Sequence, residues 1–337
     1  MKIKTNRLFI LFDNPLQKGG IEVFNDDLIN VLKERFSAIK IIFIHAPSFR
    51  ITKKYVALNK IWGFRLKKII ISLLINKEDV VIFHQPGHLK YYLRNTAKTI
   101  LFVHSPSEIQ KFKVLEVLNK IQVICVADHI ISYLTSFPQN KIKVTPPIHR
   151  FTSLKPRDLY LYRFVYVGRF SAEKKLEESI EFIKKIASEN KTKEISFDLI
   201  GEGIESQNLS QIIKNLKIDN LKISIKPWVA RESLYDLFNN YDFYISSSKI
   251  EGMPIGLREA MNAGLIPIVS DIPAHNEIIK QSYNGYIIKE DFKISDFMKD
   301  TSEIEARKQI INNIRLSLSN HYFENFKESI DAIFKNI

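Results

Sequence analysis

The sequence predicts an α/β protein made of two doubly wound domains. Short runs rich in Val, Ile and Phe alternate along the chain with longer amphipathic stretches, a pattern typical of parallel sheets buried on both faces. The polar, proline-rich segment PPIHRFTSLKPRD (146–158) interrupts the alternation, which then restarts. We therefore expect domains at 1–150 and 151–320, and a C-terminal helix over 321–337 that packs back towards the first domain.

In the first half, buried strands are separated by helical patterns. The expected strands are Arg7–Phe12, Lys40–Ala46, Asp79–Gln85, Thr99–Ser105, Gln122–Ala127 and Lys141–Thr145, with helices such as Gly20–Phe36 and Ile109–Leu118. Because ligands of open α/β sheets bind beyond the carboxyl ends of the strands, we expect the site in the crevice between the two domains.

The second half repeats the alternation. The expected strands are Arg163–Gly168, Glu194–Gly201, Lys222–Trp228, Asp242–Ser247 and Ile266–Ser270, and the expected helices are Glu173–Ser188, Glu205–Leu216, Glu232–Asn239 and Ala274–Gln281. A last amphipathic stretch, Tyr322–Ile337, closes the chain.

Composition and charge narrow the class of protein. The longest apolar run is much shorter than the ~20 residues of a transmembrane helix, and the N-terminus lacks the pattern of a signal peptide. The single cysteine, Cys125, has no disulfide partner. We therefore expect a cytoplasmic setting. The net charge is +13, yet residues 1–155 alone carry 25 Lys and Arg against 10 Asp and Glu. This asymmetry predicts an anionic partner for the first half, although a lysine-rich surface without function would also raise the total.

The stretch EGMPIGLREAMNAG (251–264) places Glu251 and Glu259 around the start of a predicted helix. Pro254 suits the first helical position, and the amides of Ile255, Gly256 and Leu257 then form an anion site that Gly256 opens to a phosphate. The two carboxylates would accept hydrogen bonds from hydroxyl groups, or would simply complement the helix dipole.

Two further loops hold candidate phosphate contacts. Gly168, Arg169 and Lys174 follow the strand RFVYV, and a lysine at a helix start opposes the helix dipole, which a bound diphosphate would explain. A solvated lysine pair with Glu177 and Glu178 explains it equally well. Gly19 and Gly20 follow the first strand, where paired glycines allow the backbone to approach a ligand.

One histidine stands at a strand end. His104 closes the run TILFV, and a histidine there is either structural or functional.

These loops together resemble the retaining GT-B fold glycosyltransferases of family 4, within the glycosyl transferases group 1, over nearly the whole chain. The run SSSKIEGMPIGLREAMNAGLIPIVSD carries the E-x7-E motif, VGRFSAEKK resembles the family's phosphate loop and GGIE its N-terminal Gly-Gly loop. One departure is Lys175, which stands where the family usually has glycine.

The resemblance implies a role for each residue. A nucleotide-sugar donor is held mainly by the second domain, with Glu251 on the donor sugar, Glu259 on the ribose, and Arg169 and Lys174 on the diphosphate. His104 lies near the reacting sugar, and the first domain receives the acceptor.

The sequence offers no metal motif such as HExxH, a Cys/His cluster or DxD, so we expect no metal or other cofactor, and protein cations stabilising the leaving diphosphate. The resemblance implies retention at the anomeric carbon, with a hexosyl or N-acetylhexosaminyl donor. Two alternatives are a nucleotide-sugar epimerase of the same fold and a non-catalytic, membrane-docked subunit that binds sugar nucleotides. The basic half carries no nucleic-acid-binding motif.

A basic and aromatic segment, Lys53–Lys68, precedes the apolar run Ile69–Ile75 in the first half. Lysines interleaved with Trp62 and Phe64 are typical of an interfacial helix on anionic lipid. An ordinary packed helix with snorkelling lysines is the alternative, and we expect Ile69–Ile75 to contribute to the core. The segment favours a peripheral transferase at the inner face of the plasma membrane, acting on a lipid-linked glycan of cell-surface polysaccharide or lipopolysaccharide assembly.

Overall fold

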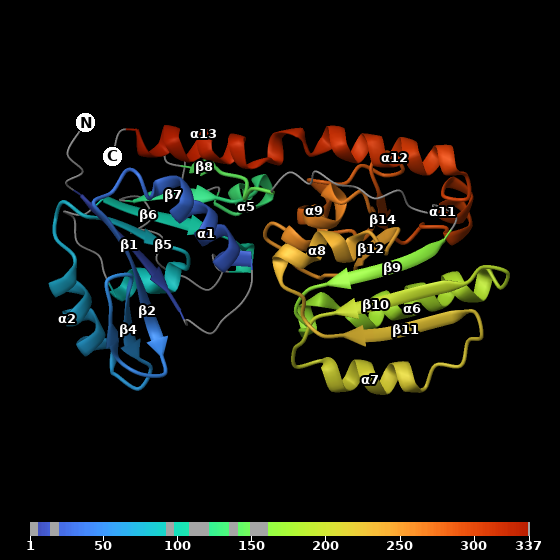
Figure 1. Cartoon of the computed structure of the whole chain (residues 1–337), viewed down its shortest axis with the longest axis horizontal. Helices are drawn as coiled ribbons and strands as arrows, with labels where there is room; N and C mark the ends of the chain where they lie inside the picture. Colours follow the sequence, from blue (N-terminus) through green and yellow to red (C-terminus); the bar gives the residue numbers. More distant parts are fainter. Residues whose placement is uncertain are drawn as a thin grey trace. The chain divides into compact units, whose positions relative to one another are not determined.

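The computed structural model describes residues 6–13, 20–91, 98–107, 121–134, 141–148 and 161–335. The chain divides into two units, one formed by Met1–Pro147 with Glu324–Ile337 and the other by Ile148–Phe323. Each unit is built on its own sheet, in which neighbouring strands are parallel except for one short edge strand (Figure 1). Among the described residues, no helix is both long enough and apolar enough to cross a bilayer.

The first unit has an eight-stranded sheet in the order β3-β4-β2-β1-β5-β6-β7-β8. Its strands are β1 (Arg7–Phe12), β2 (Ala38–Ala46), β3 (Arg50–Ile51), β4 (Tyr55–Asn59), β5 (Val80–Phe83), β6 (Lys98–Val103), β7 (Gln122–Cys125) and β8 (Lys141–Lys143). Its helices are α1 (Gly20–Leu32), α2 (Phe64–Leu74), the 3₁₀ helix η1 (Pro86–Tyr91), α5 (Asp128–Ser132) and α13 (Phe323–Phe334).

The C-terminal helix α13 packs against α1 and the turn that follows it. The ring of Phe326 lies 5.5 Å from that of Phe24 in an edge-to-face arrangement, and Arg35 donates to Asp331 at 2.7 Å. Aromatic edge-to-face pairs of this kind stabilise packing beyond the area they bury. These contacts place residues 324–335 in the first unit.

All six predicted strands of the first unit form, and their ends differ from the prediction by at most two residues. The helix expected over Gly20–Phe36 ends at Leu32, and the helix expected over Ile109–Leu118 lies outside the described residues. Strand β4, with sequence YVALN, was not predicted. It lies in the segment Lys53–Lys68, which was interpreted as part of an interfacial helix, whereas the helix begins only at Phe64. The expectation that Ile69–Ile75 lies in the core is wrong in part, since Ile71 and Ile75 are buried but Ile69 and Leu73 are exposed.

The second unit has a six-stranded parallel sheet in the order β11-β10-β9-β12-β13-β14. Its strands are β9 (Tyr162–Val167), β10 (Ile195–Ile200), β11 (Leu221–Lys226), β12 (Phe243–Ser246), β13 (Ile266–Ser270) and β14 (Tyr286–Ile288). Its helices are η2 (Ala172–Lys174), α6 (Leu176–Glu189), α7 (Ser206–Lys214), α8 (Arg231–Phe238), α9 (Ile255–Asn262), α10 (Pro273–Asn276), α11 (Ile294–Asp300), α12 (Ile304–Ser317) and η3 (Ser319–His321).

Strands β9 and β12 form the centre of this sheet. Phe164 and Phe243 are register partners with stacked rings 4.9 Å apart, and both side chains are fully buried. At the opposite end of the strands from the candidate site, Asp242 accepts hydrogen bonds from the backbone and guanidinium of Arg163 at 2.8–3.1 Å. The pairing therefore fixes the register in which the loops after β9 and β12 emerge side by side.

After β13, the second unit differs from the sequence prediction. The helix expected over Ala274–Gln281 ends at Asn276, because Asn284 accepts from the Lys280 amide at 2.7 Å and donates to the Ile278 carbonyl at 3.0 Å. These side-chain bonds compete with helical ones and turn the chain. Strand β14 and helices α11 and α12 were not predicted at all.

Lys175 connects η2 to α6 in a left-handed conformation, with φ 51° and ψ 43°. A side chain with a Cβ atom is strained there by about 1–2 kcal/mol, which explains why glycine would suit this position. The departure noted in the sequence therefore leaves the turn intact at a cost in backbone strain.

Replacing Lys175 with glycine is expected to raise the free energy of unfolding of the second unit by about 0.5–1 kcal/mol. Glycine relieves the backbone strain, and this gain exceeds the cost of the greater conformational entropy that glycine gives the unfolded chain. Thermal and denaturant unfolding measure this. Lys185→Gly, at an exposed position inside α6, is the matched control and should lower stability by about 1 kcal/mol. A destabilised Lys175→Gly variant would contradict the assignment of strain.

Candidate functional site

The loops that carry the predicted donor residues meet at one point of the second sheet. From β9 the chain adds β10 and β11 on one side, then returns to add β12 on the other side of β9. The carboxyl ends of β9 and β12 therefore flank the topological switch point, where ligands of open α/β sheets bind. The loop from Gly168 to Lys174 follows β9, and Ser247 to Glu251 follow β12.

Lys174 and Glu251 are in direct contact there, although 77 positions separate them in the sequence. The Lys174 ammonium lies 2.7 Å from Glu251 Oε1, and both side chains are largely buried. The hydroxyl of Ser248 donates to the same carboxylate oxygen at 2.7 Å. A partly buried charge pair with an added hydrogen bond is held in place more firmly than an exposed pair.

Glu259 has a cationic partner that the sequence analysis missed. Arg231, the first residue of α8, donates from Nε to Glu259 Oε1 at 2.8 Å, and the Glu259 side chain is only 6% exposed. A cation at the first position of a helix opposes the helix dipole. The same argument singled out Lys174 in the sequence analysis, and it would also have identified Arg231 as a candidate site residue.

The start of α9 presents the predicted backbone amides. Pro254 is the N-cap rather than the first helical residue, and the first bond of the helix runs from the Arg258 amide to the Pro254 carbonyl at 3.2 Å. The amides of Ile255, Gly256 and Leu257 come before it and have no acceptor within the helix. Their use as an anion site stays a prediction.

Close packing gives a further reason for Gly256. A Cβ atom at this position would lie 3.1 Å from the Val167 carbonyl and 3.2 Å from the Tyr244 hydroxyl, both tighter than ordinary van der Waals contacts. Gly256 therefore lets the first turn of α9 approach the end of β9, whether or not a phosphate binds beside it.

The loop that contains Gly168 rests on a second glycine loop, Gly201-Glu202-Gly203, which sequence reasoning also missed. The Gly168 amide donates to Ile200 at 3.0 Å, and the Phe170 amide to Glu202 at 2.9 Å. A Cβ atom at Gly201 would lie 1.9 Å from the Gly168 carbonyl oxygen, so no other residue fits without displacing the loop. The two glycines of IGEG, at the end of β10, could have predicted this second loop from the sequence.

Arg169 extends from this supported loop into solvent. Its side chain is exposed and, among the described residues, forms no hydrogen bond or ion pair. Its backbone is fixed, because the buried Tyr166 hydroxyl donates to the Arg169 carbonyl at 3.2 Å. An exposed guanidinium on a fixed backbone is available to an anionic ligand.

Hydrogen bonds from the end of β13 and from α10 hold the loop that follows β12. The Ser270 hydroxyl donates to the Ser248 carbonyl at 2.6 Å, and His275 Nδ1 lies 2.9 Å from the Ser270 carbonyl. Burial lowers the pKa of His275, so its neutral Nδ1–H donates this bond. The chain from His275 to Ser248 positions the residue that holds Glu251.

In the first unit, His104 belongs to a chain of side chains rather than standing alone. His104 Nε2 lies 2.9 Å from His84 Nδ1, and His84 Nε2 lies 3.3 Å from Asn25 Oδ1. Burial lowers the pKa of His104 to about 3 and that of His84 well below its usual range. Both rings are therefore neutral at pH 7, and Asn25 accepting from His84 makes His104 Nε2–H the donor to His84.

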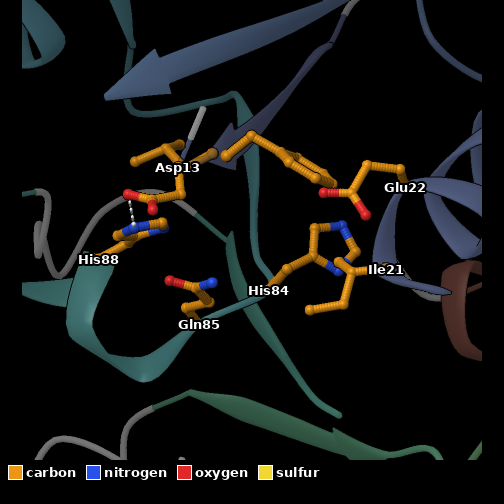
Figure 2. A pocket seen from close by; sticks show the side chains of 8 residues that line it. Asp13, Ile21, Glu22, His84, Gln85 and His88 are labelled. Carbon is orange, nitrogen blue, oxygen red and sulfur yellow. Dashed lines mark ion pairs between the residues drawn. The ribbon is translucent and has the colours of Figure 1, made fainter. Parts of the chain in front are cut away.

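A small pocket lies beside this chain at the carboxyl ends of the paired strands β1 and β5, the switch point of the first sheet. Figure 2 shows the side chains that line it. Its polar lining comes from the end of β1, the first turn of α1 and the segment after β5, and the residues are Asp13, Glu22, His84, Gln85 and His88. Asp13 lies 3.5 Å from His88 Nε2 and 2.5 Å from His45 Nδ1. These contacts, with that to His88 the largest, hold the pKa of Asp13 well below its usual range.

The Gly-Gly loop is described only in part. Gly20 is the exposed first residue of α1, whereas Gly19 lies outside the described residues. In the described part of the chain, no three His, Cys, Asp or Glu side chains are grouped as a metal site would require. The expectation that no metal or cofactor is needed stays a prediction.

Comparison with known proteins identifies a family that matches the part of the chain carrying the candidate donor residues. Residues 154–317, which contain Arg169, Lys174, Glu251 and Glu259, match the family "Glycosyl transferases group 1". The second unit is a glycosyl transferases group 1 domain. The two sheet-based units have the GT-B fold, as the resemblance predicted, and the narrower assignment to family 4 stays a prediction.

Relatives of the group 1 domain act on sugars. The chain is 25% identical over 181 residues (48% of this chain, 35% of the relative) to the GtfA subunit of a UDP-N-acetylglucosamine–peptide N-acetylglucosaminyltransferase from Streptococcus parasanguinis. It is 32% identical over 132 residues (38% and 33%) to GDP-mannose:cellobiosyl-diphosphopolyprenol alpha-mannosyltransferase of Xanthomonas campestris. The matched segments span about a third of the length of these curated relatives.

Solved structures extend the likeness to both units. The protein Alr3699/HepE of Anabaena, in complex with UDP and glucose, superposes with a TM-score of 0.77 at 12% identity, covering 99% of this chain and 100% of that one. At this identity the likeness shows the fold alone.

The histidine pair makes the stability of the first unit depend on pH. The folded pKa of His104, about 3, lies below the ordinary value of ~6.5. The unfolded chain therefore binds more protons between these values, and stability falls as the pH falls from 7 to 5, by roughly 1 kcal/mol per pH unit for this residue. Unfolding midpoints of the wild type and His104→Asn should accordingly converge at pH 5. Parallel curves would show that His104 titrates normally in the fold.

Proposed function

We propose that the chain is a retaining, metal-independent glycosyltransferase that moves a sugar from a nucleotide-diphosphate sugar to a glycan acceptor. The observation that carries the proposal is the pairing of Lys174 with Glu251 at the β9–β12 switch point. A cation and a hydrogen-bond acceptor held in contact there suit a ligand that joins a diphosphate to a sugar.

Each charged group has a task in this proposal. Arg169, Lys174 and the amides at the start of α9 receive the diphosphate, whose negative charge grows as it leaves. Glu251 accepts from hydroxyls of the donor sugar, and Glu259, oriented by Arg231, accepts from the ribose.

The reaction exchanges one bond to the anomeric carbon for another. The bond to the diphosphate oxygen breaks, the acceptor oxygen bonds to the same face, and its proton passes to the leaving phosphate. No protein nucleophile is required, unlike in a retaining glycosidase.

The first unit supplies the acceptor site in this scheme. Around the small pocket at the β1–β5 switch point lie ionised Asp13, Glu22 and Gln85, side chains of a kind that can accept hydrogen bonds from the hydroxyls of a sugar bound over the pocket. Neutral His104 and His84 lie at the same edge of the sheet and add no charge there.

We further propose a lipid-linked acceptor and an enzyme bound peripherally at the cytoplasmic leaflet, within cell-surface polysaccharide or lipopolysaccharide assembly. The positive excess of the first half supports this, and one relative is named for an acceptor carried on diphosphopolyprenol. The transferred sugar would be a hexose or N-acetylhexosamine, as in the names of the relatives.

A donor screen tests the reaction. Nucleotide sugars are incubated with lipid-linked acceptors from the source cell, and mass spectrometry follows transfer and hydrolysis. Conversion of the donor without an acceptor into an isomeric sugar would favour an epimerase, and binding without turnover would favour a non-catalytic subunit.

Arg169→Ala and Lys174→Ala are each expected to reduce kcat by about 10²–10³ and to weaken donor binding less, because charge on the leaving group peaks in the transition state. Steady-state kinetics with the donor found in the screen measure this, and Lys175→Ala is the neighbouring control. Near-normal kcat in both variants would place the diphosphate elsewhere.

Glu259→Ala is expected to weaken donor binding by roughly 1.5–3 kcal/mol, the range for hydrogen bonds to a charged group. The double variant Arg231→Ala/Glu259→Ala controls for the arginine left unpaired in the single variant. If calorimetry finds unchanged donor affinity in a folded Glu259→Ala protein, the assignment of Glu259 to the ribose is wrong.

A further inference from the structure

Helix α2 of the first unit buries a lysine and exposes large aliphatic side chains. Lys67 and Ile71 are its buried residues, whereas Leu73 is 79% exposed, Ile69 56% and Leu66 45%. An ordinary surface helix has the opposite arrangement, with its apolar face on the core and its charges in water.

The exposed aliphatic residues form one stripe. Leu66, Ile69 and Leu73 are spaced i, i+3 and i+7, which places them on one face of an α-helix. Ile71 is on the opposite face and is fully buried, where α2 lies beside η1. The stripe therefore faces away from the unit to which the helix belongs.

The apolar surface continues beyond the N-terminus of α2. Ile61, in the turn before the helix, is 79% exposed. The neighbouring Trp62 lies 4.9 Å from the exposed Phe49, ring to ring. The stripe is named here, together with Ile61, Trp62 and Phe49, the α2 surface. It is a set of large apolar groups exposed on α2 and on the segment that leads into it, and exposed apolar groups of this kind mark interaction sites.

The charge around the α2 surface identifies its partner. Residues 49–76 contain no Asp or Glu, and their exposed cations are Arg50, Lys53, Lys54, Lys60, Arg65 and Lys68. On the helix itself, Arg65 and Lys68 lie along one side of the stripe. A second copy of the chain would bring these cations together, and a nucleic acid would leave the aliphatic stripe in water, whereas an anionic lipid surface satisfies both features.

The length of α2 fixes how it would meet a bilayer. Its 11 residues extend about 16 Å, roughly half of the ~30 Å hydrocarbon core. It is therefore suited to lie in the interface with one face inserted, not to span the membrane.

We propose that the α2 surface docks the protein on an anionic membrane by insertion. Leu66, Ile69, Leu73 and Ile61 enter the boundary between headgroups and acyl chains, Trp62 sits at headgroup depth, and the surrounding Lys and Arg residues contact anionic lipid. The inference rests on the proposed function, since a lipid-linked acceptor gives such docking its use, and it adds that binding is apolar as well as electrostatic.

The test compares vesicle binding by the full-length wild type with that of three variants. Leu66→Gln/Ile69→Gln/Leu73→Gln removes the stripe, and Arg65→Glu/Lys68→Glu removes flanking charge. Leu161→Gln/Ile204→Gln/Leu316→Gln alters exposed apolar residues of the second unit and is the matched control. Sedimentation with phosphatidylglycerol-containing and pure phosphatidylcholine vesicles is measured at low and at 0.5 M salt, and size-exclusion chromatography reports oligomeric state.

We expect at least tenfold weaker binding for the stripe and charge variants, unchanged binding for the control, and residual wild-type binding at high salt. In a Trp228→Phe background, Trp62 fluorescence should shift to the blue on anionic vesicles and be quenched by brominated lipids. Three outcomes would overturn the proposal: wild-type binding by the stripe variant, complete loss of wild-type binding in salt, or a wild-type dimer that the stripe variant dissociates.

Donor affinity, measured by calorimetry on the same proteins, separates this inference from the proposed function. Because α2 is distant in sequence from the donor residues and belongs to the other unit, donor affinity should be the same in all four proteins. Vesicle binding without donor binding would refute the transferase and leave the docking surface standing, and the reverse result would refute docking alone.

Discussion

The candidate site of the second unit depends on the contact between Lys174 and Glu251, and the neighbouring hydrogen bonds and glycine loops hold these two residues in place. A largely buried ion pair is stabilising only when its geometry is fixed and its other hydrogen bonds are satisfied. Ser248 supplies one such bond to Glu251, and the hydrogen bonds from His275 through Ser270 fix Ser248. On the other side, Gly201 and Gly203 allow the loop before Lys174 to sit against the β10 loop.

The same topological constraint produces a candidate site in each unit. A parallel sheet that grows to one side of its first strand and then to the other leaves two neighbouring loops diverging at one point. In the second unit the loops after β9 and β12 carry the cation and the carboxylates. In the first, the ends of β1 and β5 carry Asp13, His84 and His88. The charged groups differ: the second unit presents Lys174 and Arg169 at this point, and the first presents Asp13 and Glu22. In the proposed function the first set would meet a diphosphate and the second set hydroxyl groups.

Sequence reasoning could predict what periodicity and helix-end chemistry encode. Most of the buried strands, the α9 motif and the anomalous Lys174 were found in this way, although β4 and β14 were not. Arg231 would have been found by the same argument. It could not predict contacts between distant segments, such as the bond of Arg231 to Glu259 or the histidine pair, because spacing along the chain carries no information about them. It also misassigned Ile69 and Leu73 to the core, since an apolar run looks the same in the sequence whether its side chains are buried or exposed.

A double-mutant cycle on Lys174 and Glu251 tests the central claim most directly. The values of kcat/KM for donor turnover are compared for the wild type, Lys174→Ala, Glu251→Ala and the double variant. If the two side chains act as one unit on the diphosphate sugar, the double variant loses less than the sum of the single losses, with a coupling of about 1–3 kcal/mol. Strictly additive losses, or single variants as active as the wild type, would contradict the account.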